Sequence, residues 1–373
     1  MKMNKDSLGL YLHIPFCISK CRYCDFCSFP KGEDEKRRYV AAMIREIEQA
    51  PQDARMVESI FFGGGTPTLL SEESFSAIFF ALKNKYNISP DTEITVEANP
   101  GTVIEKKLLT LRSLGVNRIS MGLQSAHNRE LSILGRIHTF EEFLESYRLV
   151  KACGFENINV DLMYATPSQT VESFEETLKR VIALSPSHIS AYSLIIEEST
   201  PFGKERDRLV LPSEEEEIRM YELACRLLAE AGYHHYEISN YAKEDRVCRH
   251  NLRYWQGGDY LGFGLAAHSL YRGERLAATE DFSSYIENPL ASRSVLPRVS
   301  ADAEEEYVML GLRTSFGISL SEYRVRFGKD FSGGREETLA LYARLGYLIS
   351  DGDRLALTEK GFYVSNAILC EIL

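Results

Sequence analysis

Four cysteines lie within eleven residues near the N-terminus, in the stretch CISKCRYCDFC. They are Cys17, Cys21, Cys24 and Cys27, and they make up half of the eight cysteines in the chain. The other four are scattered, unlike the spread pairs of a disulfide framework in a short secreted chain. Clustered thiols in a chain of this kind indicate a metal centre.

Three kinds of metal centre compete for this stretch. Structural zinc sites usually combine two CxxC knuckles, and here no second knuckle follows. A bacterial ferredoxin run has gaps of two, two and three residues, an order that differs from the gaps here. In the third interpretation Cys17, Cys21 and Cys24, spaced CxxxCxxC, hold three irons of a four-iron cluster. The fourth iron then keeps an open position, as catalytic centres do.

The fourth cysteine of the stretch, Cys27, stands apart from that spacing. It could be a further metal ligand, a small buried hydrophobic side chain or a redox-sensitive thiol. We expect it to lie outside the cluster.

The stretch YLHIPFCISKCRYCDF resembles the cluster loop of radical S-adenosylmethionine (radical SAM) proteins. Its YxHIPFC part resembles the branch that contains the oxygen-independent coproporphyrinogen oxidases and related haem chaperones. The resemblance implies a [4Fe–4S] cluster on Cys17, Cys21 and Cys24, with S-adenosyl-L-methionine on the fourth iron. Reductive cleavage of that cofactor gives a 5′-deoxyadenosyl radical, which the protein positions and shields.

A glycine-rich turn, FFGGGTPT, follows a predicted apolar strand. Consecutive glycines let backbone amides approach a ligand closely, although such a turn alone is weak evidence of a site. It resembles the family segment that contacts the cofactor's amino group, which assigns Gly64, Gly65 and Thr66.

Polar residues also follow the next predicted strands, where a carboxylate such as Glu97 can accept from a hydroxyl or an ammonium group. Without context, a salt-bridged strand-end acid is the simpler explanation. The resemblance assigns cofactor contacts to Glu97, Gln124, Arg136 and Asp161, and aromatic contacts flanking the cluster to Tyr11 and Tyr23. The match weakens after Asp161: the family usually reads LPGQT after DLMYG, whereas this chain reads ATPSQT from Ala165.

The segment CRHNLRYW resembles an HNxxYW signature of the haem chaperones in this branch. An imidazole can ligate haem iron, and aromatic faces suit a porphyrin. The resemblance therefore implies haem handling by His250, Asn251, Tyr254 and Trp255. The alternative is structural, with His250 and Asn251 in a helix cap or buried polar network and the two aromatic residues in the core.

The elements that must position these residues alternate between short apolar runs and helical patterns from about residue 8 to residue 196. Six predicted strands are too few for a complete eight-stranded barrel. We therefore expect an α/β fold, a partial six-stranded (βα)6 TIM-like radical SAM barrel with its site at the carboxyl ends of the strands. Helical patterns and a short hairpin around Asp351 and Gly352 predict a smaller, mostly helical, winged-helix-like C-terminal domain.

These patterns divide the 373 residues into a barrel core (1–200), a barrel extension with the HNxxYW motif (201–298) and the C-terminal domain (299–373). The chain has no long apolar run and no signal-peptide pattern, so we expect a cytoplasmic protein. A formal net charge of −11 argues against a nucleic-acid partner.

The function implied is a haem chaperone that binds haem as cargo and delivers it to an acceptor protein, which could be membrane-associated. A further partner would be an electron donor for the cluster. The chain could be a monomer, or two copies could form a homodimer. Cys17 follows the start of the chain almost at once, whereas the oxidases carry an N-terminal extension. A coproporphyrinogen III dehydrogenase, a radical-type enzyme, is the alternative, and a radical SAM RNA-modifying enzyme comes third. Whether the protein is an enzyme stays open.

Overall fold

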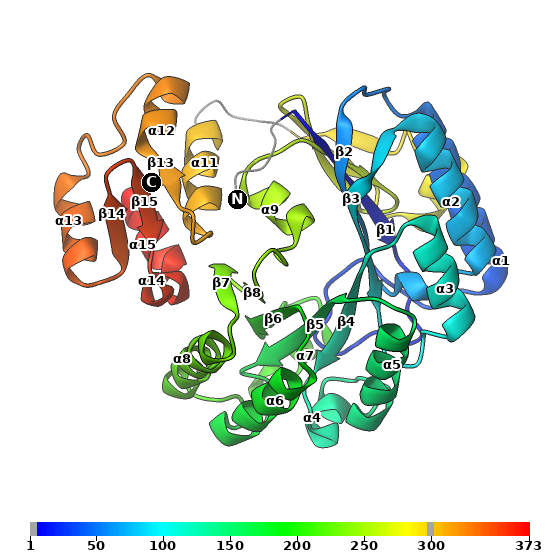
Figure 1. Cartoon of the computed structure of the whole chain (residues 1–373), viewed down its shortest axis with the longest axis horizontal. Coiled ribbons are helices and arrows are strands. Elements are labelled where there is room, and N and C mark those ends of the chain that lie inside the picture. The colour runs from blue at the N-terminus through cyan, green and yellow to red at the C-terminus, as the bar shows by residue number, and fades with distance from the viewer. Residues whose placement is uncertain (1–5, 297–301) are drawn as a thin grey trace.

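The computed structural model describes residues 6–296 and 302–373, which form one large sheet with its helices and one small domain (Figure 1). The large sheet has twelve strands in the order β12-β11-β10-β9-β1-β2-β3-β4-β5-β6-β8-β7. Its central six strands are parallel and run in chain order. The predicted partial barrel is therefore confirmed.

The six central strands match the apolar runs of the sequence, and they are β1 (Leu8–Ile14), β2 (Met56–Gly64), β3 (Asn87–Ala98), β4 (Arg118–Gln124), β5 (Asn157–Tyr164) and β6 (His188–Ser193). Helices connect them along the outside of the sheet: α1 (Glu33–Gln49), α2 (Glu72–Lys85), α3 (Glu105–Leu114), α4 (Asn128–Ile133), α5 (Phe140–Ala152) and α6 (Val171–Leu184). Parallel strands need such crossovers, and the alternation in the sequence supplies them.

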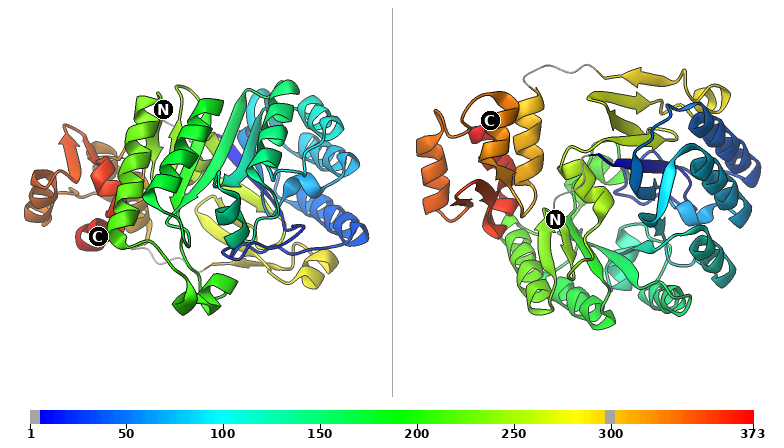
Figure 2. Two further views of the ribbon diagram at one scale, coloured as in Figure 1. Left: turned by 90° about the horizontal axis from the view of Figure 1, so that it is seen from below. Right: turned by 45° about the horizontal axis from the view of Figure 1, so that its top comes forward.

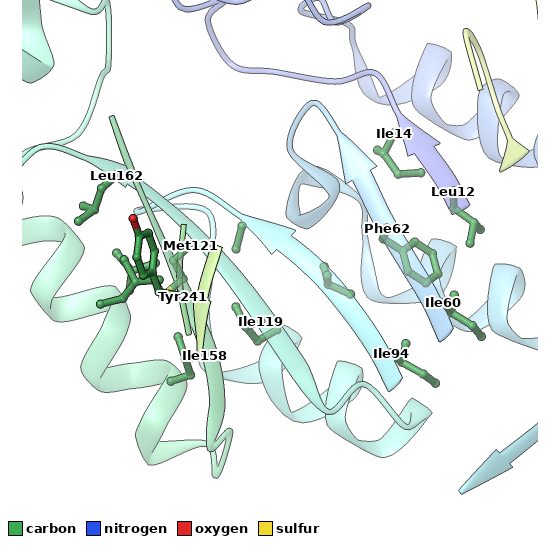
Figure 3. Close-up of a cluster of buried hydrophobic side chains, with 14 of the residues drawn as sticks. Leu12, Ile14, Ile60, Phe62, Ile94, Ile119, Met121, Ile158, Leu162 and Tyr241 are labelled. Carbon is green, nitrogen blue, oxygen red and sulfur yellow. The ribbon is translucent and has the colours of Figure 1, made fainter. Parts of the chain in front are cut away.

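The core lies between the sheet and these helices. Side chains alternate between the two faces of a strand, so one set of each strand meets the helices. In Figure 3 this set includes Leu12, Ile60, Phe62, Ile119 and Ile158, all of which are fully or almost fully buried. The inward set is largely polar, which leaves the inside of the barrel available for chemistry.

Both edges of the sheet extend beyond the six predicted strands. At one edge β8 (Asn240–Ala242) and β7 (His234–Glu237) add antiparallel to β6. At the other edge β9 (Tyr260–Phe263) adds parallel to β1. An antiparallel set follows it: β10 (His268–Tyr271), β11 (Glu274–Ala278) and β12 (Arg293–Val295).

Four further helices belong to this part of the chain: α7 (Pro201–Lys204), α8 (Glu214–Glu230), α9 (Arg249–Trp255) and α10 (Phe282–Glu287). Figure 1 and the right view of Figure 2 show α9 within the curve of the sheet instead of on its outer surface. This helix carries the HNxxYW segment.

The small domain combines helices with a three-stranded antiparallel sheet of order β13-β15-β14. Its elements are α11 (Asp302–Leu312), β13 (Ile318–Ser319), α12 (Leu320–Phe327), α13 (Glu336–Arg344), β14 (Leu348–Asp351), β15 (Arg354–Leu357), α14 (Glu359–Tyr363) and α15 (Ser365–Ile372). The predicted boundary between residues 298 and 299 lies outside the described residues. Across the described part of the chain, no helix is both long enough and apolar enough to span a bilayer.

Candidate cluster and cofactor site

A cavity of about 300 Å³ lies at the carboxyl ends of the central strands. It collects nearly all the residues predicted to bind the cluster and S-adenosylmethionine. Its lining includes Cys17, Cys21, Tyr23, Cys24, Gly64, Gly65, Thr66, Glu97, Gln124, Arg136 and Asp161. These residues come from four strands and three loops, so the fold brings together positions that lie far apart in the sequence.

The cysteine loop is fixed on both sides by backbone contacts. Phe16 forms a β-bridge with Phe29, and the Cys17 amide donates to the Phe29 carbonyl at 3.2 Å. The Arg22 amide donates to the Leu134 carbonyl at 3.0 Å. The loop is therefore anchored to the sheet and to the segment after α4.

The structure separates Cys27 from the other three cysteines. It is absent from the cavity lining and packs, half-buried, against the hydrophobic core. Its carbonyl accepts a hydrogen bond from His13 Nε2 at 2.8 Å. This placement supports the expectation that Cys27 lies outside the cluster, which stays a prediction.

The donor set fits an iron–sulfur cluster. Cys17, Cys21 and Cys24 are free cysteines on one cavity wall. Burial raises the pKa of the Cys24 thiol, and the neighbouring Cys21 and Cys17 raise it further. Arg136 Nη1 donates to Cys21 Sγ at 3.6 Å, so a positively charged group lies beside the cysteines. Two buried atoms of residues that line the cavity, Arg136 Nε and His138 Nε2, have no hydrogen-bond partner among the described residues. A bound ligand would satisfy such atoms.

Close packing of the backbone explains why glycine occupies this turn. A Cβ at Gly65 would lie 2.7 Å from the Phe16 carbonyl oxygen, and Gly64 has a φ of +106°. The Gly65 and Thr66 amides donate to the carbonyls of Ile14 and Phe16 at 2.8 and 2.7 Å. The glycines therefore let the end of β2 lie directly against the cysteine loop.

Two half-buried carboxyl groups line the cavity. Desolvation raises the pKa of Glu97 to about 8, and the nearby Asp161 contributes to the shift. Glu97 Oε2 accepts a hydrogen bond from the Gly64 amide at 3.1 Å. Burial also raises the pKa of Asp161, although Asn159 Nδ2 donates to its Oδ1 at 2.7 Å. An arriving hydroxyl or ammonium donor would stabilise either carboxylate.

Gln124 adopts a left-handed conformation, with φ of +76°, at the end of β4. Strained backbone of this kind in a non-glycine residue is concentrated at functional sites. Tyr192 Oη donates to Gln124 Oε1 at 3.1 Å and holds the amide at the cavity.

Sequence reasoning missed Asn99, His138 and Tyr192, which also line the cavity. Asn99 Nδ2 donates to Thr66 Oγ1 at 2.7 Å, and its Oδ1 accepts from Arg136 Nη2 at 2.6 Å. Asn99 directly follows the third strand in TVEANP, and its position at the carboxyl end of that strand was the signal that could have indicated it.

Tyr11 is not among the residues that line this cavity. Its hydroxyl donates to His13 Nδ1 at 3.0 Å, and its ring stacks near Phe61 and His250. A cofactor contact for Tyr11 stays a prediction, and in this conformation the side chain joins the inside of the barrel to α9.

His250 is buried inside the barrel with both ring nitrogens hydrogen-bonded. Nδ1 lies 2.9 Å from Ser59 Oγ, and Nε2 lies 2.8 Å from Tyr254 Oη. The buried Glu93 carboxylate accepts from the amides of Arg249 and His250 at the start of α9. Burial lowers the pKa of His250 to about 3. This geometry favours the buried polar network, and haem ligation by His250 would require the side-chain hydrogen bond at the ligating nitrogen to break.

The other residues of the motif have different surroundings. Asn251 is half-buried, and the Tyr254 ring packs edge-on against Tyr260 at 4.6 Å between centroids. The Trp255 indole hydrogen-bonds the buried Glu237 and lines a second cavity of about 710 Å³. That cavity lies between the barrel and the C-terminal domain.

Comparison with known proteins places the site in a family. The family model of the Radical SAM superfamily matches residues 11–181, and that of the HemN C-terminal domain matches residues 300–364. The coproporphyrinogen III oxidase (HemN) of Escherichia coli, described as a radical SAM enzyme, superposes with a TM-score of 0.85 at 26% identity. The alignment covers 98% of this chain and 90% of that structure. The fold and the cysteine site define a radical SAM protein.

Relatives named heme chaperone HemW match along nearly the whole chain. The protein of Bacillus subtilis (strain 168) is 34% identical, covering 96% of this chain and 97% of the relative. That of Haemophilus influenzae is 35% identical, covering 97% of both chains. That of Escherichia coli (strain K12) is 41% identical over 70% of this chain and 69% of the relative. The chain belongs to the HemW family of radical SAM proteins.

Proposed function

We propose that this protein is a haem chaperone that binds haem and delivers it to acceptor proteins. The similarity to relatives named heme chaperone HemW, over more than nine-tenths of both chains, carries this proposal. The similarity to a coproporphyrinogen III oxidase is lower in identity. The chaperone role is therefore favoured over decarboxylation of coproporphyrinogen.

Membership of the radical SAM superfamily implies a [4Fe–4S] cluster and S-adenosylmethionine. Cys17, Cys21 and Cys24 would hold the cluster, which when bound supplies an electron for cofactor cleavage. Arg136 would stabilise the negative charge of the thiolates, and Glu97 and Asp161 would accept from the cofactor's donor groups. The turn at Gly64 would position the backbone beside the ligand.

Haem handling is proposed at the C-terminal end of α9. The cavity beside Trp255 is within the usual range for ligand pockets, about 300–1,000 Å³. Trp255, Tyr307 and Leu310 give it apolar surface, and Arg326 and Arg354 offer guanidinium groups. Five carboxylates outnumber the two guanidinium groups in this lining: Asp259, Glu306, Glu322, Asp351 and Asp353. The apolar ring would therefore lie inside and the propionates would point toward solvent. Trp255 is then the residue of the motif that touches the cargo.

The remaining partners follow from the transfer of haem. We propose an acceptor protein, membrane-associated or free, which takes the cargo. A separate electron donor would reduce the cluster, and a second copy of the chain is a further candidate partner.

Trp255 is the only tryptophan in the chain, so one variant tests the cargo site. Haem titration followed at the Soret band should show binding about 10-fold weaker in Trp255→Phe, a loss of about 1.4 kcal/mol. Phe80→Leu, an exposed aromatic on α2, is the control and should bind as the wild type does. Equal haem affinity in Trp255→Phe and the wild type would contradict this location.

A further inference from the structure

A second group of metal-ligating side chains lies between the barrel and the C-terminal domain. Cys225 is on α8, His235 is on β7 and Glu359 begins α14. One ligand atom from each lies within 4.8 Å of the others. The cysteine cluster and the haem proposal use none of these residues.

The imidazole of His235 is held in one orientation. Its ring stacks on Tyr241 with 4.1 Å between centroids and meets Phe362 edge-on at 5.1 Å. Nε2 faces the Ile238 carbonyl at 3.4 Å and can donate its hydrogen there. Nδ1 then presents its lone pair to the other two residues of the group.

Two further potential metal-donor atoms lie close to Nδ1. Cys225 Sγ lies 3.8 Å from Nδ1, and Glu359 Oε1 lies 3.9 Å from it. An imidazole nitrogen, a thiol sulfur and a carboxylate oxygen thus converge on one point, and these are donor atoms that a divalent cation such as Zn²⁺ can bind.

We propose that Cys225, His235 and Glu359 form a zinc site that joins the C-terminal domain to the barrel. Thiolate, imidazole and carboxylate are all ligands that Zn²⁺ accepts. A tetrahedral ion with the usual bond lengths separates its ligand atoms by about 3.3–3.6 Å. The two pairs that include His235 Nδ1, at 3.8 and 3.9 Å, must therefore shorten by about half an ångström. The Cys225–Glu359 pair, within 4.8 Å, must shorten by up to about 1.5 Å. Glu359 can supply that movement because its side chain is 57% exposed.

The surroundings resemble those of a built metal site. The Ile238 carbonyl would fix the imidazole tautomer, the usual outer-shell role, and Tyr241 Oη lies 3.4 Å from Cys225 Sγ. Three protein ligands leave a fourth position for water, reached past the exposed Glu359. Zinc would displace the Cys225 thiol proton to the solvent, so binding releases about one proton per ion.

The test uses the full chain with its iron–sulfur cluster reconstituted, so that iron occupies the other cysteine site. After dialysis against Zn²⁺, metal analysis should find about one zinc per chain in the wild type and in Cys370→Ser, whose thiol is exposed. Cys225→Ser should weaken zinc affinity at least about 100-fold, since outer-shell changes alone cost about 10–100-fold. Failure of the wild type to retain zinc, or retention by Cys225→Ser, would overturn the proposal.

Glu359→Gln tests the site without a change in the core, because the Glu359 side chain is exposed. Weaker zinc binding in this variant therefore cannot be attributed to unfolding. The variant should keep the circular dichroism spectrum of the wild type and bind zinc at least about 10-fold more weakly. Co²⁺ uptake by a full chain with Cys17, Cys21 and Cys24 replaced by serine gives a second readout. A sulfur-to-cobalt charge-transfer band that is present in this chain and lost when Cys225→Ser is added supports the site. The same band with and without Cys225→Ser refutes it.

Discussion

His250 Nε2 lies 2.8 Å from Tyr254 Oη, one turn further along α9, and its other ring nitrogen lies 2.9 Å from Ser59 Oγ. The histidine of the HNxxYW segment thereby fastens α9 to β2 inside the barrel. The helix end beyond it, at Trp255, faces the larger cavity.

Replacing His250 by alanine should therefore destabilise the fold. The change leaves the hydroxyl groups of buried Ser59 and half-buried Tyr254 without their partner, which costs about 1–3 kcal/mol of unfolding free energy. Urea unfolding measures this loss, with His268→Ala as the control because His268 is exposed. Haem affinity should stay within about threefold of the wild type. A large loss of haem affinity at unchanged stability would instead identify His250 as the axial ligand.

Cys21→Ser and Cys27→Ser form a matched pair for the cluster. Only Cys21 lines the cavity beside Arg136, whereas Cys27 packs against the core. After anaerobic reconstitution, Cys27→Ser should contain about four irons per chain and Cys21→Ser far fewer. Iron analysis and the visible absorption of the cluster measure both. Equal loss in the two variants would show that all four cysteines serve the cluster.

The raised pKa of Glu97 predicts a pH-dependent difference in stability. Its folded-state pKa of about 8 exceeds the ordinary value of 4.5, so ionisation destabilises the folded chain as pH rises through that interval. Glu97→Gln removes this penalty. The stability of the variant relative to the wild type should increase between about pH 4.5 and 8, by up to a few kcal/mol, and then level off.

Denaturant unfolding without added ligand measures this trend. Asp161→Asn removes the second cause of the raised Glu97 pKa, so the pH range over which the two chains differ in stability should become narrower. If the stability difference between Glu97→Gln and the wild type does not change with pH, Glu97 has the same pKa in the folded and the unfolded chain, which contradicts the raised value.

Ala165 and Ser168 both adopt left-handed backbone, with φ of +56° and +65°. The family pattern DLMYG followed by LPGQT places glycine at these two positions, so the departures in this chain fall where glycine is favoured. Ala165→Gly and Ser168→Gly should each raise the unfolding free energy by up to about 1 kcal/mol. Thermal unfolding checks this, and lower stability in both variants would contradict the backbone argument.

Sequence patterns were sufficient to predict the elements whose structure depends on neighbouring residues in the chain. The six central strands follow from β-branched runs, and the rule that parallel sheets bind ligands at their carboxyl ends places Glu97, Gln124 and Asp161 at the cavity. Their assignment as cofactor contacts came from the family resemblance and stays a prediction. Isolated polar residues such as His138 and Tyr192 carry no spacing signal, so only the fold shows that they reach the cavity.

Other features depend on tertiary structure alone. The added edge strands are three to five residues long, too short for periodicity to indicate them. That α9 enters the barrel depends on Glu93 and Ser59, which lie far from His250 in the sequence. A motif whose residue types suit haem therefore gave no information about which side chain faces a ligand.

The most direct test of the chaperone role is a paired assay on the anaerobically reconstituted protein. Haem is titrated at the Soret band, and coproporphyrinogen III is supplied with S-adenosylmethionine and a reductant in parallel samples. The account predicts stoichiometric haem uptake, haem transfer to an apo-protein acceptor and unchanged coproporphyrinogen III. Formation of protoporphyrinogen IX, or the absence of haem binding, would contradict it.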